Sequence, residues 1–240
     1  MAKQAQGTAK TKKPNGDEPK SPRSSYVDKA YQEIKDRILQ NTMPIGYHAT
    51  EQELSEILEM SRTPTREALI RLKNEGLVDV RPRRGMRVLP ISVADMKEIY
   101  EILTALETTA VALVAENGLS EEELAELRGT VDDMEQSLKK EDLVGWAEAD
   151  KQFHSLLVAF CGNQRIQTLV NQFMDQSHRC RMLTLKLRPR PTGSVSDHAK
   201  VVEAISRRDI DTARRTHRQH RERSGKMLID LLNHLGLTQV

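Results

Sequence analysis

Apolar residues recur every three or four positions through most of the chain, which is the spacing of helices with one buried face. The first such segment begins at Tyr26. We expect it to end near Asn41, because Pro44 and Gly46 follow and a proline disfavours helical backbone in the residue before it. The predicted buried face of this helix consists of Val27, Tyr31, Ile34 and Ile38.

Two further helices are predicted in the next thirty-five residues. Thr50 and Glu53 have the spacing of a capping box, so a short second helix should open at Thr50. Thr63 can cap a third helix with Pro64 at its first position, where the missing N–H of proline costs nothing. Gly76 is placed to end this third helix.

A hairpin follows the three helices. Residues 77–80 and 86–89 alternate as short strands do, and residues 82–85 between them have the composition of a turn. Three helices followed by a hairpin is the order of a winged helix-turn-helix, which we expect over residues 26–91 as a DNA-binding domain.

The rest of the chain predicts an all-helical domain over residues 95–235, so the fold class is mainly α. Ser120 and Glu123 repeat the capping-box spacing, and Asp209 can cap the last helix. We expect about six helices in this bundle, with breaks at Gly118, at 162–163, at 188–193 and near Asp209.

Composition adds limits to this picture. Residues 1–25 are rich in Lys, Pro, Gly, Ser and Gln and predict a disordered basic tail. The longest apolar stretches are far shorter than the roughly 20 residues of a membrane span, and the N-terminus lacks an apolar signal region, so we expect a cytoplasmic, nucleoid-associated protein with no membrane partner. The two cysteines, Cys161 and Cys180, predict neither a disulfide framework nor a Cys-rich zinc motif.

Nucleic-acid binding must come from local basic clusters, because the formal net charge is only +2. The start of the third helix provides one, with Arg62 and Arg66 beside the hydroxyls of Thr63 and Thr65. In a helix-turn-helix this end meets the base edges of the major groove, where arginine pairs with guanine and hydroxyls reach bases or phosphates. Residues 81–85 provide a second basic cluster at the hairpin tip.

Residues 61–69 read Ser-Arg-Thr-Pro-Thr-Arg-Glu-Ala-Leu, and 75–77 read Glu-Gly-Leu. This pattern resembles the recognition helix of the GntR family of regulators, and the resemblance spans about residues 26–90. It implies that Arg62, Arg66, Arg84 and Gly85 carry DNA contacts, with Gln52 at a position that often adds one.

Asp150 and His154 are four residues apart on a predicted helix, so both side chains can point to one spot. His198 and His220 lie on later helices, and the residues alone allow either a metal site or a hydrogen-bonded core network. His217 lies one turn from His220 and could take its place. The spacing is weak by itself, because Asp230 and His234 repeat it where a surface pair is expected.

The region 95–235 also resembles the FCD ligand-binding domain of the FadR branch of the GntR family. Many members bind a divalent metal through one Asp and three His, and Asp150, His154, His198 and His220 fall in those places. Nitrogen and oxygen ligands suit zinc first, and also nickel, manganese or iron. The resemblance further implies a small organic acid as effector, for which Arg181 is a candidate partner. One departure is Leu103, where the family commonly has an arginine that holds the acid.

These features predict a homodimeric transcription regulator, in the family's commoner mode a repressor, that binds palindromic double-stranded operator DNA under the control of a small molecule. A metal-dependent hydrolase is the first alternative, but the sequence near the four ligands offers no second carboxylate as general base, so we expect no enzyme. The second alternative is a metal-free regulator that senses a fatty acyl or other apolar ligand.

Overall fold

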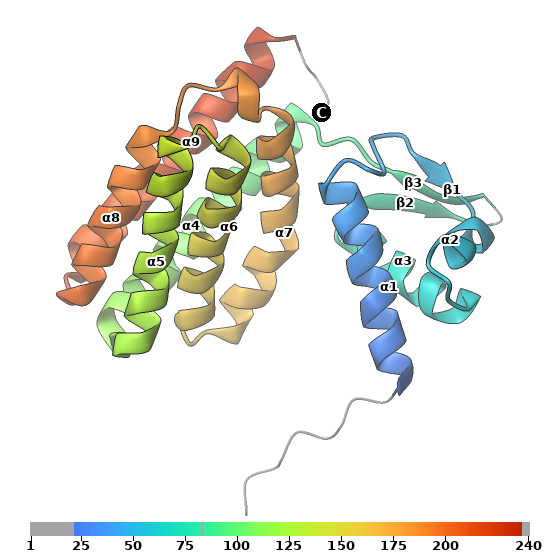
Figure 1. Cartoon of the computed structure of the whole chain (residues 1–240), viewed down its shortest axis with the longest axis horizontal. Helices are drawn as coiled ribbons and strands as arrows, with labels where there is room; N and C mark the ends of the chain where they lie inside the picture. The colour runs from blue at the N-terminus through green and yellow to red at the C-terminus, as the bar shows by residue number, and fades with distance from the viewer. Residues whose placement is uncertain (1–21, 83, 237–240) are drawn as a thin grey trace, which may run out of the picture.

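The computed structural model describes residues 22–82 and 84–236. Three helices and a small antiparallel sheet form the N-terminal part, and a bundle of helices forms the C-terminal part (Figure 1). The predicted fold class, mainly α with a winged helix-turn-helix and an all-helical bundle, is confirmed. Within the described ranges, no helix is both long enough and apolar enough to cross a membrane.

The N-terminal part joins a helix-turn-helix to a three-stranded sheet. The middle strand, β3, pairs antiparallel with β1 on one side and with β2 on the other. Its elements are α1 (Pro22–Leu39), β1 (His48–Ala49), α2 (Glu51–Ile57), α3 (Arg62–Asn74), β2 (Val78–Arg81) and β3 (Gly85–Val88).

One apolar core holds this part together. The inner faces of the three helices meet the strands there, and Ile34, Leu69 and Met86 are fully buried. Helix α2 begins as the sequence predicts: the Thr50 hydroxyl accepts the Glu53 backbone N–H at 3.1 Å, and the Glu53 carboxylate accepts the Thr50 N–H at 2.7 Å. This capping box satisfies two N–H groups that the first turn of a helix leaves without partners.

The start of α1 differs from the expectation. The helix begins at Pro22, four residues before Tyr26, because Pro is well tolerated in a first helical turn. The end of the predicted basic tail is therefore helical, and residues 1–21 lie outside the described residues.

Helix α3 and the sheet also differ in detail. The residue before α3 is Ser61, so Thr63 does not cap the helix, and Pro64 lies at its third position. A backbone N–H at the third helical position has no acceptor within the helix, so a proline, which lacks this N–H, costs little there. Strand β1 has only two residues, too few to leave an alternating pattern in the sequence.

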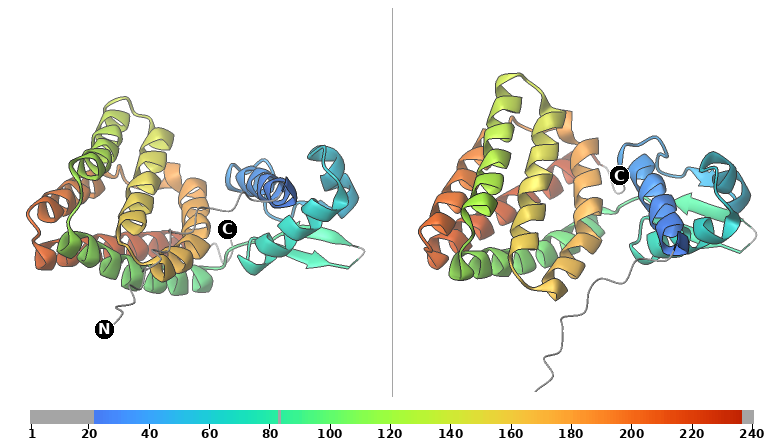
Figure 2. Two further views of the ribbon diagram at one scale, coloured as in Figure 1. Left: turned by 90° about the horizontal axis from the view of Figure 1, so that it is seen from below. Right: turned by 60° about the horizontal axis from the view of Figure 1, so that its bottom comes forward.

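Among the described residues, the C-terminal part contains six α-helices, with the two longest, α4 and α9, packed side by side along one side of the bundle (Figures 1 and 2). The remaining helices cover the inner face of this pair. The elements are α4 (Val93–Asn117), α5 (Glu121–Lys139), α6 (Leu143–Phe160), α7 (Gln164–Leu183), the short 3-10 helix η1 (Leu185–Leu187), α8 (Thr192–Ser206) and α9 (Ile210–His234).

Local signals account for most of the boundaries in the bundle. The capping box of Ser120 and Glu123 and the cap by Asp209 form as predicted. The break between α5 and α6 was not predicted, because it contains neither glycine nor proline. There the chain turns through Glu141, whose φ of 58° is in the left-handed region, and Asp142 caps α6 by accepting the Gly145 N–H.

Helix α7 connects the two parts of the molecule. The Lys35 ammonium on α1 lies 2.5 Å from the Asp175 carboxylate on α7, and Gln176 donates to the Glu75 carbonyl at 2.6 Å. Arg179, with 2% of its surface exposed, donates to the Leu89 carbonyl at 3.0 Å. Polar contacts of one helix thus hold the N-terminal part against the bundle.

Replacing Gly85 by Ala should destabilise the wing. Gly85 has a φ of +78°, and a Cβ at this position would lie 2.1 Å from the Ala49 carbonyl oxygen, so β1 and β3 would have to separate. We expect a loss of at least about 2 kcal/mol in the free energy of unfolding, measured by urea denaturation followed by circular dichroism.

The matched control is Gly129→Ala on α5. An added Cβ there meets nothing within 4 Å, and alanine is the better helix former. This variant should be stabilised by about 0.5–1 kcal/mol. An unchanged unfolding midpoint for Gly85→Ala would contradict the tight packing of the wing on β1.

Candidate functional site

The first candidate surface is the exposed N-terminal end of α3. Arg62, Thr63 and Arg66 are all exposed there. Arg62 donates to the Gln52 side-chain oxygen on α2 at 2.9 Å, and Arg66 lies 3.9 Å from the Glu51 carboxylate with 69% of its side chain exposed. The structure therefore brings four of the predicted DNA-binding residues together at the ends of α2 and α3.

Thr65 is not part of this surface, which corrects its prediction as a contact residue. It has no exposed surface and lies between α2 and α3. Its hydroxyl donates to the Ser61 carbonyl at 3.1 Å and accepts from the Ser55 hydroxyl at 3.2 Å. Every hydrogen bond of this hydroxyl is thus made inside the protein, where it fixes α2 against α3.

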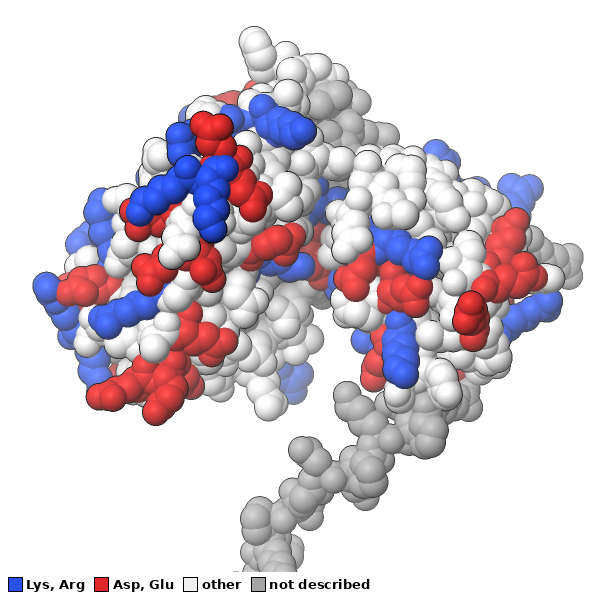
Figure 3. Space-filling model, viewed as in Figure 1, with Lys and Arg blue, Asp and Glu red and all other residues white. Residues whose placement is uncertain are grey.

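The wing places its two predicted residues differently. Arg84 is exposed at the tip, whereas Gly85 is buried against Ala49. Gly85 is therefore required for the close approach of β3 to β1, and the expectation that it faces DNA is not supported by its position. Basic side chains are thus exposed both at the α3 end and on the wing, and Figure 3 shows Lys and Arg side chains among acidic ones on the N-terminal part of the surface.

The second candidate site is a group of four buried side chains in the bundle. Asp150 and His154 come from α6, His198 from α8 and His220 from α9, and each has 3% or less of its surface exposed. One ligand atom of each lies within 4.8 Å of those of the other three. Nε2 of His198 lies 3.4 Å from Nε2 of His154, and Oδ1 of Asp150 lies 3.7 and 3.9 Å from these two nitrogens.

This arrangement fits a divalent cation. Ligand atoms around a tetrahedral ion at about 2.1 Å are about 3.4 Å apart, close to the spacings observed. Burial lowers the pKa of His198 and of His220, so both imidazoles are neutral, as a metal ligand must be. Burial alone would raise the pKa of Asp150, but the Arg181 guanidinium and the imidazoles hold it below the ordinary value, so the carboxylate is ionised.

A second buried carboxylate, Glu107 on α4, lies behind His154 and was not found by sequence reasoning. Its Oε2 is 2.7 Å from Nδ1 of His154 and 3.1 Å from Nε2 of His217. Arg221 lies 3.5 Å from its Oε1 and, against the effect of burial, holds the pKa of Glu107 well below the ordinary value. An ionised Glu107 accepts the Nδ1–H of His154, so Nε2 of His154 is the nitrogen that faces the four-residue group.

His217 and His220 have separate places. His220 belongs to the group with Asp150, whereas His217 belongs with Glu107 and His154. His217 therefore does not take the place of His220. Its partner could not be foreseen, because Glu107 lies on α4, 110 residues earlier in the chain.

Arg181 is the cation that contacts this group of four buried side chains. It reaches from α7 to Oδ2 of Asp150 and is buried to 93%. Leu103 on α4, at the position where a family arginine was expected, is 1% exposed and belongs to the apolar core. The positive charge of this site thus comes from α7 and not from α4.

Comparison with known proteins identifies both parts of the chain. Residues 98–223 match the FCD domain, and residues 27–88 match the bacterial regulatory proteins of the gntR family. The chain belongs to the GntR family. It is therefore a transcription regulator and not an enzyme, as expected from its sequence.

Two curated relatives and one solved structure illustrate the similarity. An uncharacterized HTH-type regulator from the TAR-I ttuE-ttuC′ intergenic region of Agrobacterium vitis is 42% identical over 135 residues, 55% of this chain and 79% of the relative. The HTH-type transcriptional repressor RspR of Escherichia coli is 26% identical over 83% of this chain and 87% of its own. The E. coli McbR/YncC structure, 21% identical, shares the fold with a TM-score of 0.73 over 85% of this chain and 97% of its own.

Acidification should destabilise this GntR regulator through its buried imidazoles. Burial lowers the pKa of His217 from its ordinary value of 6.5 to about 4. Between pH 6.5 and pH 4 the unfolded chain binds a proton at His217 that the folded chain does not. The free energy of unfolding therefore has its full value above about pH 6.5 and decreases as the pH falls toward 4. In EDTA, His217→Gln should reduce the proton uptake on unfolding in this range by about one, measured from urea midpoints at several pH values.

The control for this prediction is His234→Gln. His234 is exposed at the end of α9, so its replacement should leave the pH dependence unchanged. Equal pH dependence of the wild type and His217→Gln would show that His217 titrates normally in the folded protein.

Proposed function

We propose that this GntR regulator is a homodimeric repressor that binds a palindromic operator, and that a small organic acid bound beside a divalent metal ion controls its affinity for DNA. The observation that carries the regulatory part of this proposal is the convergence of Asp150, His154, His198 and His220 within 4.8 Å. RspR, a relative of similar length, is named a repressor, which supports the direction of control. A regulator of chromosomal DNA works in the cytoplasm, where we place it.

The exposed ends of α2 and α3 would enter the major groove. Arg62 and Arg66 have their guanidinium groups on the surface, and Gln52 holds Arg62 in place through a hydrogen bond of 2.9 Å. Arginine makes bidentate contacts to guanine, and these contacts carry sequence information. Arg84 on the wing would contact the DNA backbone or the minor groove.

The metal would be held by Asp150, His154, His198 and His220, with zinc as the first candidate and nickel, manganese or iron as the others. When bound, the ion would supply positive charge and open coordination positions for an acid. Arg181 contacts Asp150 and is the buried cation best placed to pair with the carboxylate of the effector. Four buried polar ligands disfavour the alternative of a fatty acyl or other apolar ligand at this position.

Helix α7 provides a physical route from this site to the DNA-binding domain. It carries Arg181 at the buried site and, one to two turns earlier, Asp175 and Gln176, which contact α1 and the end of α3. An effector that binds one arrangement of this helix better than another shifts the position of the DNA-binding domain by its difference in affinity.

Replacing Arg62 and Arg66 together by Ala should abolish specific operator binding. Each bidentate arginine contact contributes about 1–3 kcal/mol, so the double variant should bind at least about 30-fold more weakly. The measurement is fluorescence anisotropy with labelled DNA from upstream of the protein's own gene, at constant salt.

The control for this experiment is the double variant Arg128→Ala and Arg207→Ala, which removes two exposed arginines of the bundle. It lowers the net charge by the same two units as the Arg62 and Arg66 variant. It should bind like the wild type. Equal binding by the Arg62 and Arg66 variant would contradict the proposed recognition surface.

Metal binding should depend on both the ligands and Glu107. Protein purified without added metal should retain about one divalent ion per chain by mass spectrometry, and the Asp150→Ala, His198→Ala double variant should retain none. Glu107→Gln keeps the size of the side chain but loses the charge that fixes His154, so zinc affinity measured by calorimetry should fall about 10- to 100-fold. A metal-free wild type that also fails to bind added zinc would favour the apolar-ligand alternative.

A further inference from the structure

The buried polar cluster of the bundle holds more positive than negative charge. Arg181, Arg188 and Arg221 bring three guanidinium groups to it, whereas Asp150 and Glu107 bring two carboxylates. Imidazoles that bind a metal are neutral, and a divalent ion in the proposed metal site would add two further positive charges. The loaded site would therefore hold five positive charges against two negative ones.

A third carboxylate, Asp197 on α8, borders this cluster without changing its charge. It lies 3.5 Å from Nδ1 of His220 and also pairs with the Arg223 guanidinium. Because the charges of Asp197 and Arg223 cancel, the excess of positive charge around Arg181 and Arg188 stays as it is.

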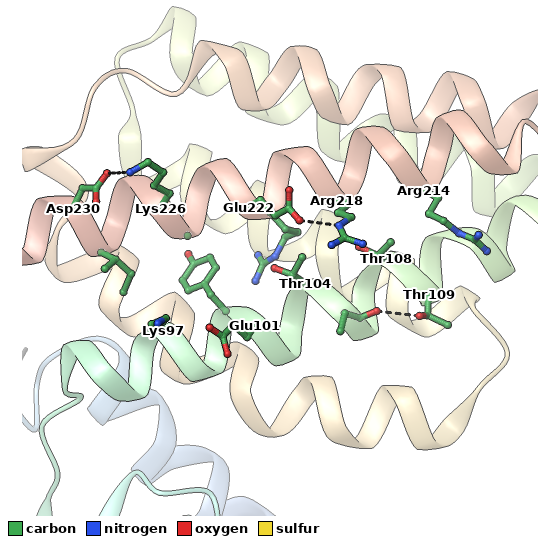
Figure 4. A pocket seen from close by; sticks show the side chains of 15 residues that line it. Lys97, Glu101, Thr104, Thr108, Thr109, Arg214, Arg218, Glu222, Lys226 and Asp230 are labelled. Atoms are coloured by element: carbon green, nitrogen blue, oxygen red, sulfur yellow. Dashed lines mark hydrogen bonds and ion pairs between the residues drawn. The ribbon is translucent and has the colours of Figure 1, made fainter.

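Cations on the outer side of α4 and α9 are arranged differently (Figure 4). There Arg218 pairs with Glu222 at 2.7 Å and Lys226 pairs with Asp230 at 2.8 Å, although all four side chains are exposed to water. An exposed charge needs no partner, whereas a buried charge without one is costly. The buried excess is therefore the feature of this domain that requires an anion.

Three buried hydrogen-bond donors lie in the same part of the bundle. The Tyr100 hydroxyl, Nε of Arg181 and Nη2 of Arg188 have no acceptor among the described residues. Tyr100 is 5% exposed and is near enough to both guanidinium groups to act on them electrostatically. Native proteins leave few buried donors unsatisfied, so these three mark a place where the oxygen atoms of a ligand would be held.

Arg188 is the member of this group that lies nearest the surface. It is half-buried in the segment between η1 and α8, directly after Leu187, which is 54% exposed. Its Nε donates to the Thr184 hydroxyl at 3.1 Å, which orients the guanidinium. Burial lowers the pKa of Arg188, and the positive charge of Arg181 lowers it further. Two guanidinium groups held this close are suited to an anion that contacts both of them.

We propose that the effector is a small acid with two anionic groups, one directed to the metal position and Arg181, and the other to Arg188 and the Tyr100 hydroxyl. The inference rests on the proposed function and narrows its ligand from an organic acid to a dianion. A second carboxylate or a phosphate would supply the same charge. Arg188 would then be the cation that determines specificity, in a site where α4 offers Leu103 and no arginine.

The test compares acids that differ only in the second anionic group. Malate and 3-hydroxybutyrate share a carbon skeleton, as do succinate and butyrate, and 3-phosphoglycerate and glycerate form a pair in which the second group is a phosphate. In calorimetry on the zinc-loaded full chain at constant ionic strength, a dianion should bind at least about 10-fold more tightly than its matched monoanion. The pair that shows this difference distinguishes a dicarboxylate from a phosphorylated acid.

Arg188→Met tests the residue assigned to the second anionic group. It should reduce the affinity for the dianion at least about 10-fold and leave the affinity for the matched monoanion unchanged. The control is Lys186→Met, which removes the same charge from an exposed position on η1 and should bind both acids like the wild type. Discrimination that survives in Arg188→Met would overturn the role of Arg188.

A second readout needs no ligand. In EDTA, Arg188→Met should raise the urea midpoint, because it removes a buried charge that has no anion beside it. Saturating dianion should raise the midpoint of the zinc-loaded wild type and have little effect on the zinc-loaded variant. A lower midpoint for the ligand-free variant would mean that the charge of Arg188 is already compensated inside the protein, and would overturn the inference.

The outcomes separate this inference from the proposed function. Equal binding of each dianion and its matched monoanion would overturn the second anionic group and leave the organic acid standing. Failure of all six acids to bind the zinc-loaded protein would overturn both.

Discussion

The charge of two carboxylates inside the helical bundle is the constraint on which the regulatory domain depends. Asp150 and Glu107 are each 99% buried, and an unpaired charge at such a depth would cost several kcal/mol. Each is therefore met by an arginine, Arg181 for Asp150 and Arg221 for Glu107, and both share the imidazoles of neighbouring helices. The pairing draws residues from α4, α6, α7, α8 and α9 to one place, so the polar cluster fixes how these helices pack as well as what they can bind.

The same constraint gives α7 its role in the molecule. Arg181 must reach Asp150, so the register of α7 against α6 is fixed at the buried site. Asp175, Gln176 and Arg179 on that helix then lie against the DNA-binding domain. Over six residues a helix rises only about 9 Å, so in the proposed mechanism a change in how Arg181 is held would act on contacts one or two turns away. The proposed coupling would run through one helix with a defined contact at each end.

Local sequence signals were sufficient for most of the fold. The capping boxes at Thr50 and Ser120, the glycine at 118 and the cap at Asp209 all act within one helical turn, and the structure contains each of them. The turn at Glu141 was missed because no glycine or proline marks it. Its conformation is stabilised instead by the cap that Asp142 provides to the next helix.

The candidate sites were predictable only where spacing within one helix or a family pattern identified them. Asp150 and His154 are one turn apart, so their side chains had to converge. Glu107 gave no such signal, because its partners lie 47 and 110 residues away and only the packing of α4 on α6 and α9 brings them together. Thr65 is the opposite case: it belongs to the family pattern of the recognition helix, but its side chain points inward to the hydroxyl of Ser55.

Leu103 stands where an arginine is expected from the family resemblance, so the proposed acid would need a cation from another helix. An arginine at this position would bring a charge from α4, whereas Leu103 is buried in the apolar core. The cation that contacts Asp150 is Arg181, on the helix that also holds the DNA-binding domain. If an acid takes the place of Asp150 as the partner of Arg181, the contact that recognises the ligand and the contact that positions the DNA-binding domain belong to one helix. Moving the cation from α4 to α7 would therefore shorten the path from ligand to DNA without adding any element to the fold.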